Sequence, residues 1–295
     1  MKADLHIHSH FSNDGEKSIS EIVQLCRESQ VELFSITDHN CVRGNQEAAR
    51  LAADTEGLLF VPGIEIDCHY RGTDLHLLGF NIDWTASDFT ELEKAVDQKY
   101  MDAIPDMIDK LASEGMPIDQ EELMAKSSGK VPSAELFAEV MLANPAFQNN
   151  GKLRPYMPGG QRSDMPLVNF YLDYFAQGKP AYVPIEHLSF SDAIALVREH
   201  GGVPVIAHPG LNFKGREQEV EELLDLGAAG LEVFNNYHDQ KQVAYFAGLT
   251  RQRKSIMTCG SDFHGKIKPL ISMGQYLPTQ DYKTELSNSL RQLVR

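Results

Sequence analysis

Short apolar runs recur along the chain and alternate with longer stretches in which apolar residues return at helical spacing. The runs are predicted to be strands, and after a first strand that begins by Lys2 they cover residues 33–36, 58–64, 74–80, 203–207, 230–234 and 256–259. Strands that alternate with helices in this way are typical of a fold with a parallel sheet. The pattern therefore predicts an α/β protein.

The stretches between the runs contain helix signals. Ser18 and Glu21 form a capping-box pair, which predicts a helix over 18–29. Pro105 is expected to start a new helix or to kink the helical stretch 87–114. The remaining predicted helices span residues 43–55, 133–142, 164–176, 189–200, 216–226 and 238–251.

Residues 99–179 interrupt the alternation, because no predicted strand falls within them. We expect a mostly helical insertion there, placed between two parts of one barrel, residues 1–98 and 180–295, and covering the active site. Residues 144–161 are rich in Asn, Gly and Pro and are predicted to form a long loop. Long loops inside compact domains are often lids or binding loops.

The basic residues of this loop region stand out in an acidic chain. In one interpretation these residues are solvated loop charges. In the other, one of the two arginines, Arg154 or Arg162, binds a substrate phosphate through its planar guanidinium. Both interpretations remain open at this point.

Composition narrows the class of protein. A length of 295 residues is enough for one barrel with an insertion. No apolar stretch approaches the ~18 residues of a membrane span, and the early first strand leaves no room for a signal peptide. Four cysteines that lie far apart, without a Cys-x-x-Cys pair, are expected to be reduced thiols of a cytoplasmic protein. The oligomeric state is left open.

The net charge of −15 bears on the partners of this chain. It argues against nonspecific binding of long nucleic acid, which depends on many contacts from Lys and Arg to phosphates. A small phosphorylated substrate such as a nucleotide remains compatible, because bound metals can supply the positive charge.

Six of the eleven histidines follow or lie within the predicted strands, and three acids accompany them. The carboxyl ends of parallel barrel strands share one face, so these residues are expected to converge. Imidazoles and carboxylates bind divalent metals, and mixed ligation of this kind allows Zn, Mn or Fe. We therefore predict a multinuclear metal site in a metal-dependent hydrolase. The nine candidate ligands are His6, His8, Asp14, His39, Glu65, His76, His208, Asp262 and His264.

The motifs that carry these residues resemble those of the PHP (polymerase and histidinol phosphatase) family of metal-dependent phosphoesterases. In order along the chain they are His6-Ile7-His8, Thr37-Asp38-His39, Pro62-Gly63-Ile64-Glu65, His76, Ala207-His208-Pro209-Gly210 and Gly260-Ser261-Asp262-Phe263-His264. The resemblance spans residues 4–265. It implies a distorted (β/α)7 barrel with a helical insertion, and an enzyme that hydrolyses phosphomonoesters or phosphodiesters.

The resemblance also implies how two or three metal ions divide the ligands. One ion would be bound by His6, His8, Glu65 and Asp262. Glu65 would bridge to a second ion, completed by His76 and His208. A third would be bound by Asp14, His39 and His264. Asp4 and Asp38, each close in sequence to a ligand imidazole, are expected to accept its remaining N–H or else to bond to the backbone.

The expected mechanism follows from clustered cations, which lower the pKa of a bound water from near 16 towards ~7 and neutralise charge on the phosphoryl group. His238 follows the strand at 230–234 and is not among the ligands. It is the candidate general acid and phosphate donor, provided that it faces the pocket.

The substrate class rests on the resemblance alone. Stand-alone relatives with a helical insertion hydrolyse nucleoside monophosphates, 3′,5′-bisphosphates or short oligonucleotides, so a nucleotide is expected, with a metabolite such as histidinol phosphate as the alternative. Such relatives often have Arg-Pro-His where the helix of the insertion begins. This chain has Gly129-Lys130-Val131-Pro132-Ser133 there, without the Arg and the His.

Two further alternatives belong to other classes. An amidohydrolase would share the barrel and the His-x-His start, but it commonly bridges its metals with a lysine carbamate, and no Lys closes a predicted strand here. A non-catalytic PHP domain would have lost ligands, whereas this chain has a complete set and no polymerase segment.

Overall fold

The strands form two sheets in the computed structural model, which describes residues 1–276 and 280–294. The smaller sheet is parallel and consists, in order, of β1 (Ala3–Asp4), β2 (Leu33–Phe34) and β3 (Leu59–Phe60). The larger sheet has the order β6-β4-β5-β7-β8-β9. Its strands are β6 (Leu188–Ser189), β4 (Gly63–Tyr70), β5 (Thr73–Phe80), β7 (Val203–Ile206), β8 (Gly230–Phe234) and β9 (Ile256–Cys259).

Strand β5 runs antiparallel to both of its neighbours, so the larger sheet is mixed and only partly parallel. The cause is the connection between β4 and β5. Tyr70 pairs with Thr73, and the two residues between them, Arg71 and Gly72, have φ values of +48° and +78°. A two-residue turn with positive φ at both positions closes a β-hairpin, which places its strands antiparallel.

The edges of the two sheets are joined by a few backbone contacts. Leu5 donates its N–H to the carbonyl of Cys259 at 3.0 Å, and Ile7 forms a parallel bridge with Phe263. Elsewhere His39, which follows β2, forms a parallel bridge with Glu65 of β4. These are isolated bridges, not continuous ladders. The α/β class is confirmed, while the distorted barrel stays a prediction.

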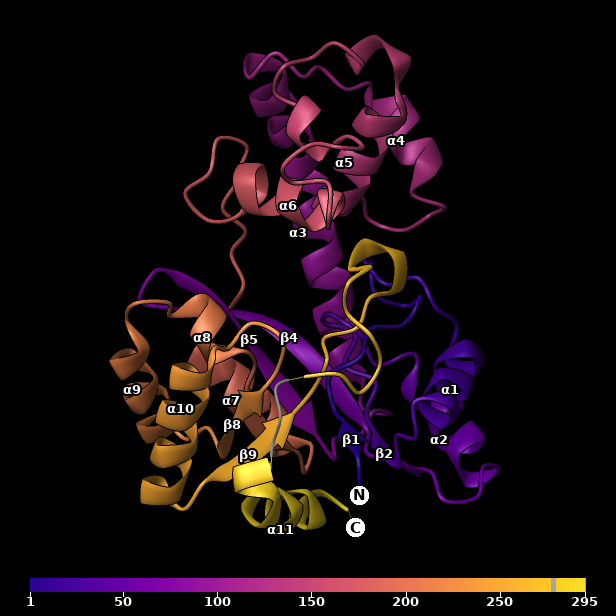
Figure 1. The fold of residues 1–295 in the computed structure, drawn as a ribbon. Coiled ribbons are helices and arrows are strands. Elements are labelled where there is room, and N and C mark those ends of the chain that lie inside the picture. Colours follow the sequence, from indigo (N-terminus) through magenta and orange to yellow (C-terminus); the bar gives the residue numbers. More distant parts are fainter. Residues whose placement is uncertain (277–279, 295) are drawn as a thin grey trace.

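Helices cover the strands in the lower lobe of the molecule (Figure 1). The predicted capping box of α1 is confirmed, because the Ser18 side chain accepts from the N–H of Glu21 and the Glu21 carboxylate accepts from the N–H of Ser18. The helices of this lobe are α1 (Ile19–Glu28), α2 (Asn45–Ala53), α7 (Phe190–Glu199), α8 (Pro209–Asn212), α9 (Val220–Asp225), α10 (Gln240–Arg253) and α11 (Lys283–Leu293).

Helix α3 (Ser87–Ser113) connects the two lobes and continues as one helix through Pro105. Proline removes one helical hydrogen bond, so another interaction must hold the helix together. The N-terminal half of α3 packs into the core of the lower lobe through residues such as Phe89, and its C-terminal half packs into a separate core through residues such as Leu111. Packing at both ends stabilises the helix across the proline.

The upper lobe in Figure 1 contains the predicted insertion, and its hydrophobic core is formed by residues between Ala103 and Ala181. Besides the end of α3 it contains α4 (Gln120–Lys126), α5 (Ala134–Ala143) and α6 (Pro166–Phe170), and α6 continues into a π-helical turn over Tyr171–Phe175. Among the described residues, no helix has both the length and the apolar character that a membrane span requires.

Candidate metal centre

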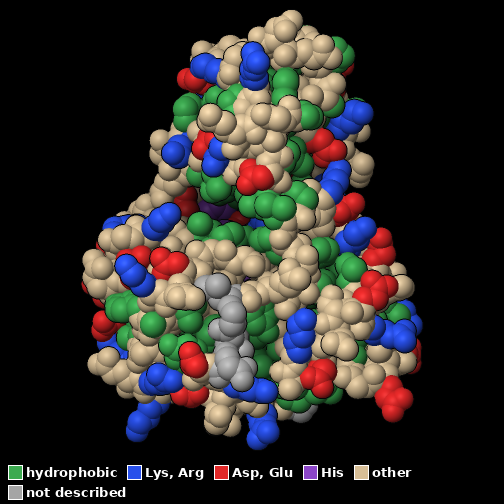
Figure 2. All heavy atoms as spheres, in the orientation of Figure 1, with side chains coloured by type: hydrophobic (Ala, Val, Ile, Leu, Met, Phe, Trp, Pro, Cys, Tyr) green, Lys and Arg blue, Asp and Glu red, His purple; other side chains and the backbone are tan. Residues whose placement is uncertain are grey.

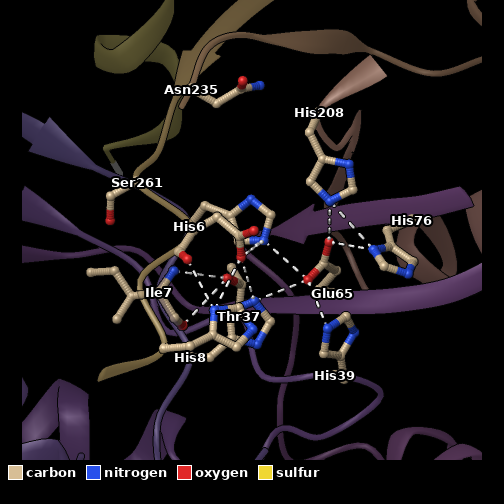
Figure 3. Close-up of polar contacts among 12 residues, drawn as sticks. His6, Ile7, His8, Thr37, His39, Glu65, His76, His208, Asn235 and Ser261 are labelled. Atoms are coloured by element: carbon tan, nitrogen blue, oxygen red, sulfur yellow. Dashed lines mark hydrogen bonds and ion pairs between the residues drawn. The ribbon is translucent and has the colours of Figure 1, made fainter. Parts of the chain in front are cut away.

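The nine predicted ligands converge near Glu65, and Figure 3 shows five of the histidines, His6, His8, His39, His76 and His208, around its carboxylate. We call these nine residues the ligand cluster. Within it, ligand atoms that lie no more than 4.8 Å apart form one group of His6, His8, Glu65 and Asp262, one of His8, Asp14, His39 and His264, and one of Glu65, His76 and His208. These groups match the division that the sequence resemblance implies, with His8 added to the group around Asp14.

Glu65 lies inside strand β4, not after the end of a strand as expected, and its two carboxylate oxygens face different histidines. Oε2 lies 3.0 Å from Nε2 of both His6 and His8. Oε1 lies 3.0 Å from Nδ1 of His76 and 3.2 Å from Nε2 of His208. A carboxylate placed in this way can bind two cations, one through each oxygen.

Two ligands lie on strained backbone. His208 has a φ of +25° and Asp262 a φ of +58°, a region that non-glycine residues rarely adopt. The N–H of His208 donates to Glu232 Oε2 at 2.8 Å, and the N–H of Asp262 donates to the carbonyl of His6 at 2.8 Å. Strain of this kind persists only where surrounding contacts hold it, and it is found most often at functional sites.

Four of the imidazoles bind an oxygen atom through Nδ1. His6 bonds Glu232 Oε1 at 2.9 Å, and His39 bonds Asp67 Oδ1 at 2.9 Å. His208 bonds Asn212 at 2.8 Å, and His264 bonds the carbonyl of Asp262 at 2.9 Å. A ring held through Nδ1 presents Nε2 on its other side, and it is the Nε2 lone pair of the neutral ring that would bind a metal.

Two further observations show that the residues fit divalent metal ions. Nε2 of His8 is buried and makes no hydrogen bond of acceptable geometry, although Glu65 Oε2 is 3.0 Å away. Burial would raise the pKa of Glu65, but the neighbouring charges of His6 and His39 hold that pKa well below its usual range, so the carboxylate is ionised. Buried lone pairs and an ionised carboxylate at one place are the donors that a metal centre needs.

Two buried acids of this centre were not predicted. Asp67 accepts from His39, lies 3.5 Å from Nε2 of His76, and therefore contacts two of the ligand groups. Glu232 binds both the ring of His6 and the backbone of His208. Signals for both exist in the sequence, because Asp67 lies two residues after Glu65 on the same face of a strand, and Glu232 is an acid within an apolar strand.

Of the two roles expected for Asp4 and Asp38, the structure shows the bond to the backbone, since neither carboxylate accepts from an imidazole. Asp4 accepts from the N–H and hydroxyl of Ser261 at 2.8 and 2.6 Å. Asp38 accepts from the N–H and hydroxyl of Ser9 at 2.6 and 2.7 Å. Both carboxylates therefore hold loops that carry ligands, and the acids that bind imidazoles are Glu232 and Asp67.

The geometry also argues against His238 as general acid or phosphate donor. Its Nδ1–H donates to the carbonyl of Val233 at 2.9 Å, and its Nε2 accepts from the N–H of Gly210 at 2.8 Å. Burial lowers its pKa, so the ring is neutral and both nitrogens are occupied. His238 instead joins the end of β8 to the loop after His208.

The two arginines of the insertion differ. Arg162 is already paired, with Nε 3.1 Å and one terminal nitrogen 3.0 Å from the carboxylate of Asp173. Its predicted binding of a phosphate would have to break this pair. Arg154 begins a short 3-10 helix (Arg154–Tyr156), is exposed, and has no side-chain hydrogen bond or ion pair within residues 1–276 and 280–294.

Lys268 and Tyr237 are further groups that sequence reasoning missed. Lys268 donates to Asp262 Oδ2 at 2.5 Å and to the Tyr237 hydroxyl at 2.9 Å, and that hydroxyl also donates to Asp262 Oδ2. With Oδ2 held, Asp262 presents Oδ1 to His6 and His8, at 3.4 and 3.2 Å. Nothing in the local sequence around Lys268 marks it, because the loop after Gly265 brings it back to the cluster.

Comparison with known proteins agrees with this chemistry. The family model described as PHP domain matches residues 4–179, more than half of the chain. A 5′-3′ exoribonuclease of Haemophilus influenzae is 28% identical over 269 residues, which cover 89% of this chain and 90% of the relative. A 3′,5′-nucleoside bisphosphate phosphatase of Chromobacterium violaceum is 28% identical, with 88% and 86% covered.

A phosphoribosyl 1,2-cyclic phosphate 1,2-diphosphodiesterase of Eggerthella lenta is 26% identical and covers 94% of this chain and 100% of the relative. Among solved structures, an amidohydrolase from Chromobacterium violaceum with bound sulfate and no metal superposes with a TM-score of 0.76 at 24% identity, with 94% and 92% covered. At that identity the likeness shows a shared fold.

Proposed function

This chain belongs to the PHP domain family and is a hydrolase of phosphoric esters, and we propose that it hydrolyses a nucleotide with two or three divalent metal ions bound in the ligand cluster. The observation that carries the metal part is the placement of Glu65, whose two oxygens face separate pairs of histidines. The names of the relatives support the nucleotide part, since they refer to bisphosphates and ribonucleic acid.

The residues have distinct proposed roles. The ligand cluster would hold the ions, with Mn, Zn and Fe all compatible with its nitrogen and oxygen donors. Bound ions would supply positive charge to the phosphoryl oxygens and lower the pKa of a coordinated water towards ~7. Asp67 and Glu232 orient the imidazoles, and Lys268 with Tyr237 holds Asp262 so that one oxygen faces the cluster.

The geometry favours this proposal over the amidohydrolase alternative. A bridging lysine carbamate would require a lysine nitrogen between the ligand groups. Lys268 is the lysine that contacts the ligand cluster within the described residues, and its Nζ is bound to Asp262 and Tyr237. The two oxygens of Glu65 already lie between these groups, so Glu65 would serve as the bridge in place of a lysine.

The proposal is tested by metal analysis and a substrate screen on the same preparation. Elemental analysis is expected to find two or three divalent ions per chain, and one ion or fewer after reconstitution would contradict the assignment. The screen compares nucleoside monophosphates, 3′,5′-bisphosphates, short oligonucleotides and histidinol phosphate, each with Mn, Zn and Fe after chelation. Hydrolysis of histidinol phosphate without hydrolysis of any nucleotide would overturn the substrate proposal.

A further inference from the structure

The insertion contacts the lower lobe at the loop that carries the ligand Asp14. Figure 2 shows the surface hollowed where the two lobes meet, with histidine side chains visible there. Lys130, which lies between α4 and α5, donates from Nζ to the carbonyl of Ser12 at 2.8 Å. Ser12 is two residues before Asp14, so the insertion holds the backbone of this loop directly.

The side chain of Ser12 contacts three members of the ligand group around Asp14. Ser12 is 1% exposed, and its hydroxyl donates to Asp14 Oδ1 at 2.6 Å. The hydroxyl oxygen also lies 3.4 Å from Nδ1 of His8 and 3.5 Å from the backbone nitrogen of His39. With Oδ1 held by Ser12, Asp14 presents Oδ2 to Nε2 of His264 at 3.1 Å and to Nε2 of His39 at 3.7 Å. Ser12 therefore orients the one carboxylate of this group.

Asp14 lies on the loop between β1 and α1, and the position of its carboxylate depends on how that loop is held. Besides the bond from Lys130, Asn13 donates to Asp97 Oδ1 of α3 at 3.3 Å, so the helix that continues into the insertion holds the same loop. Ordering a loop costs conformational entropy. Contacts that order it before an ion binds therefore raise the affinity for the ion.

A second contact of the insertion lies near His264. Lys266, two residues after His264, pairs with Glu139 of α5 at 2.8 Å, and its backbone N–H donates at 2.7 Å to Glu16, at the end of the Asp14 loop. The side chains of Lys266 and Glu139 are 53% and 42% exposed. Exposed pairs contribute little, so this contact is expected to add less than the partly buried hydrogen bond made by Lys130.

We propose that the insertion controls how tightly the third metal ion is bound, because Lys130 positions the loop that carries Asp14. The ion concerned is the one that His8, Asp14, His39 and His264 would hold. This inference rests on the proposed function and commits it to three ions. Lys130 is a positioning residue, since its hydrogen bond is to Ser12 and not to a ligand.

The charge of Lys130 separates this role from an electrostatic effect. A positive charge near a cation site weakens the binding of the cation, so removing the charge by itself should tighten the binding. Lys130→Met keeps most of the length of the side chain but loses both the charge and the hydrogen bond to Ser12. A weaker third ion in this variant must therefore come from the lost hydrogen bond.

The test counts and titrates ions in the full chain. Chelated protein is titrated with Mn²⁺, and bound ions are counted by elemental analysis. The parent is expected to bind three ions, and Lys130→Met to bind one of them 10- to 100-fold more weakly, with the other two unchanged. Lys130→Arg, which can donate to the same carbonyl, should restore the affinity to within about threefold. Ser12→Ala should weaken the same ion at least as strongly as Lys130→Met, because it removes the bond to Asp14.

Asp14→Asn identifies which ion is affected, since it removes the carboxylate of that group. In the Asp14→Asn background, Lys130→Met should leave the two remaining ions unchanged. Lys152→Met is the matched control, because Lys152 pairs with Glu114 at 2.5 Å, and its loss removes the same charge and a contact internal to the insertion. This control should bind three ions as the parent does. Unfolding in urea, followed by circular dichroism, checks that each variant is folded.

The outcomes separate this inference from the proposed function. If Lys130→Met binds three ions as tightly as the parent, the inference is wrong. Equal weakening of all three ions also overturns it, because that result reflects a general loss of structure. Unchanged ions with a KM that rises roughly tenfold would show that Lys130 binds substrate instead. A parent that binds two ions overturns this inference and leaves the proposed function intact, whereas one ion or fewer contradicts both.

Discussion

The ligand cluster and the insertion differ in how their polar groups are held. In the ligand cluster, four imidazoles bind an oxygen atom through Nδ1, and Asp262 is held by Lys268 and Tyr237. In the insertion, Arg154 is exposed and has no ion-pair partner among the described residues, and Arg162 forms a partly exposed pair with Asp173. The ligand cluster is therefore preorganised by its neighbours, whereas the arginines of the insertion are exposed to solvent.

The largest effect is expected from Glu65→Gln. The substitution keeps the shape of the side chain but removes the charge that would bridge two ions, an effect of several kcal/mol or on the order of 10³-fold in kcat. Activity is expected to be lost and the bound metal to fall, while circular dichroism shows an unchanged fold. Turnover within tenfold of the parent would falsify the bridging role.

A smaller effect is expected from the acids behind the imidazoles. Asp67→Asn and Glu232→Gln keep the side-chain volume but weaken the hydrogen bonds that fix His39 and His6. Loss of such outer contacts typically lowers metal affinity or activity 10- to 100-fold. Titration of the chelated protein with Mn or Zn would measure this directly. Asp54→Asn, on the exposed end of α2, is the control, and equal affinities in all three variants would show that the cluster does not depend on these acids.

Much of the ligand cluster could be predicted because its residues follow local motifs along the strands. His6 and His8 are two residues apart after β1, and that spacing places both rings on one side of an extended chain. The helices were predictable for a similar reason, since capping and apolar spacing are local signals, as the Ser18–Glu21 capping box shows.

The other residues of the site could not be predicted, because their roles depend on contacts between segments that are distant in the sequence. Asp67 lay outside the predicted strand 58–64, and only the hairpin of β4 and β5 places it opposite His76. His238 looked available because its partners, the carbonyl of Val233 and the N–H of Gly210, are backbone groups that carry no side-chain signal. Lys130 lies in the segment without metal motifs, and only the docking of the insertion brings its ammonium group to the carbonyl of Ser12, beside Asp14.

A further prediction concerns Arg154 of the insertion. If the free guanidinium of Arg154 binds a substrate phosphate, Arg154→Ala removes a contact made equally in the ground and transition states. KM should then rise roughly tenfold with kcat nearly unchanged. Steady-state kinetics on the best substrate of the screen measure both constants. A KM within twofold of the parent would show that Arg154 is a solvated loop charge.

Arg162 is the matched counterpart of Arg154, and the smallest effect is expected there. Its guanidinium binds Asp173 within the insertion, with both side chains 38% exposed, so its removal should leave kcat/KM within twofold. Partly exposed ion pairs contribute ~0.2–1 kcal/mol, and the free energy of unfolding measured in urea should fall by that amount. Asp173→Asn should lower it similarly, and the double variant should show less than the sum, because both single changes break the same pair. If Arg162→Ala instead raises KM tenfold while Asp173→Asn does not, the pair opens to bind substrate, and the insertion binds phosphate through Arg162.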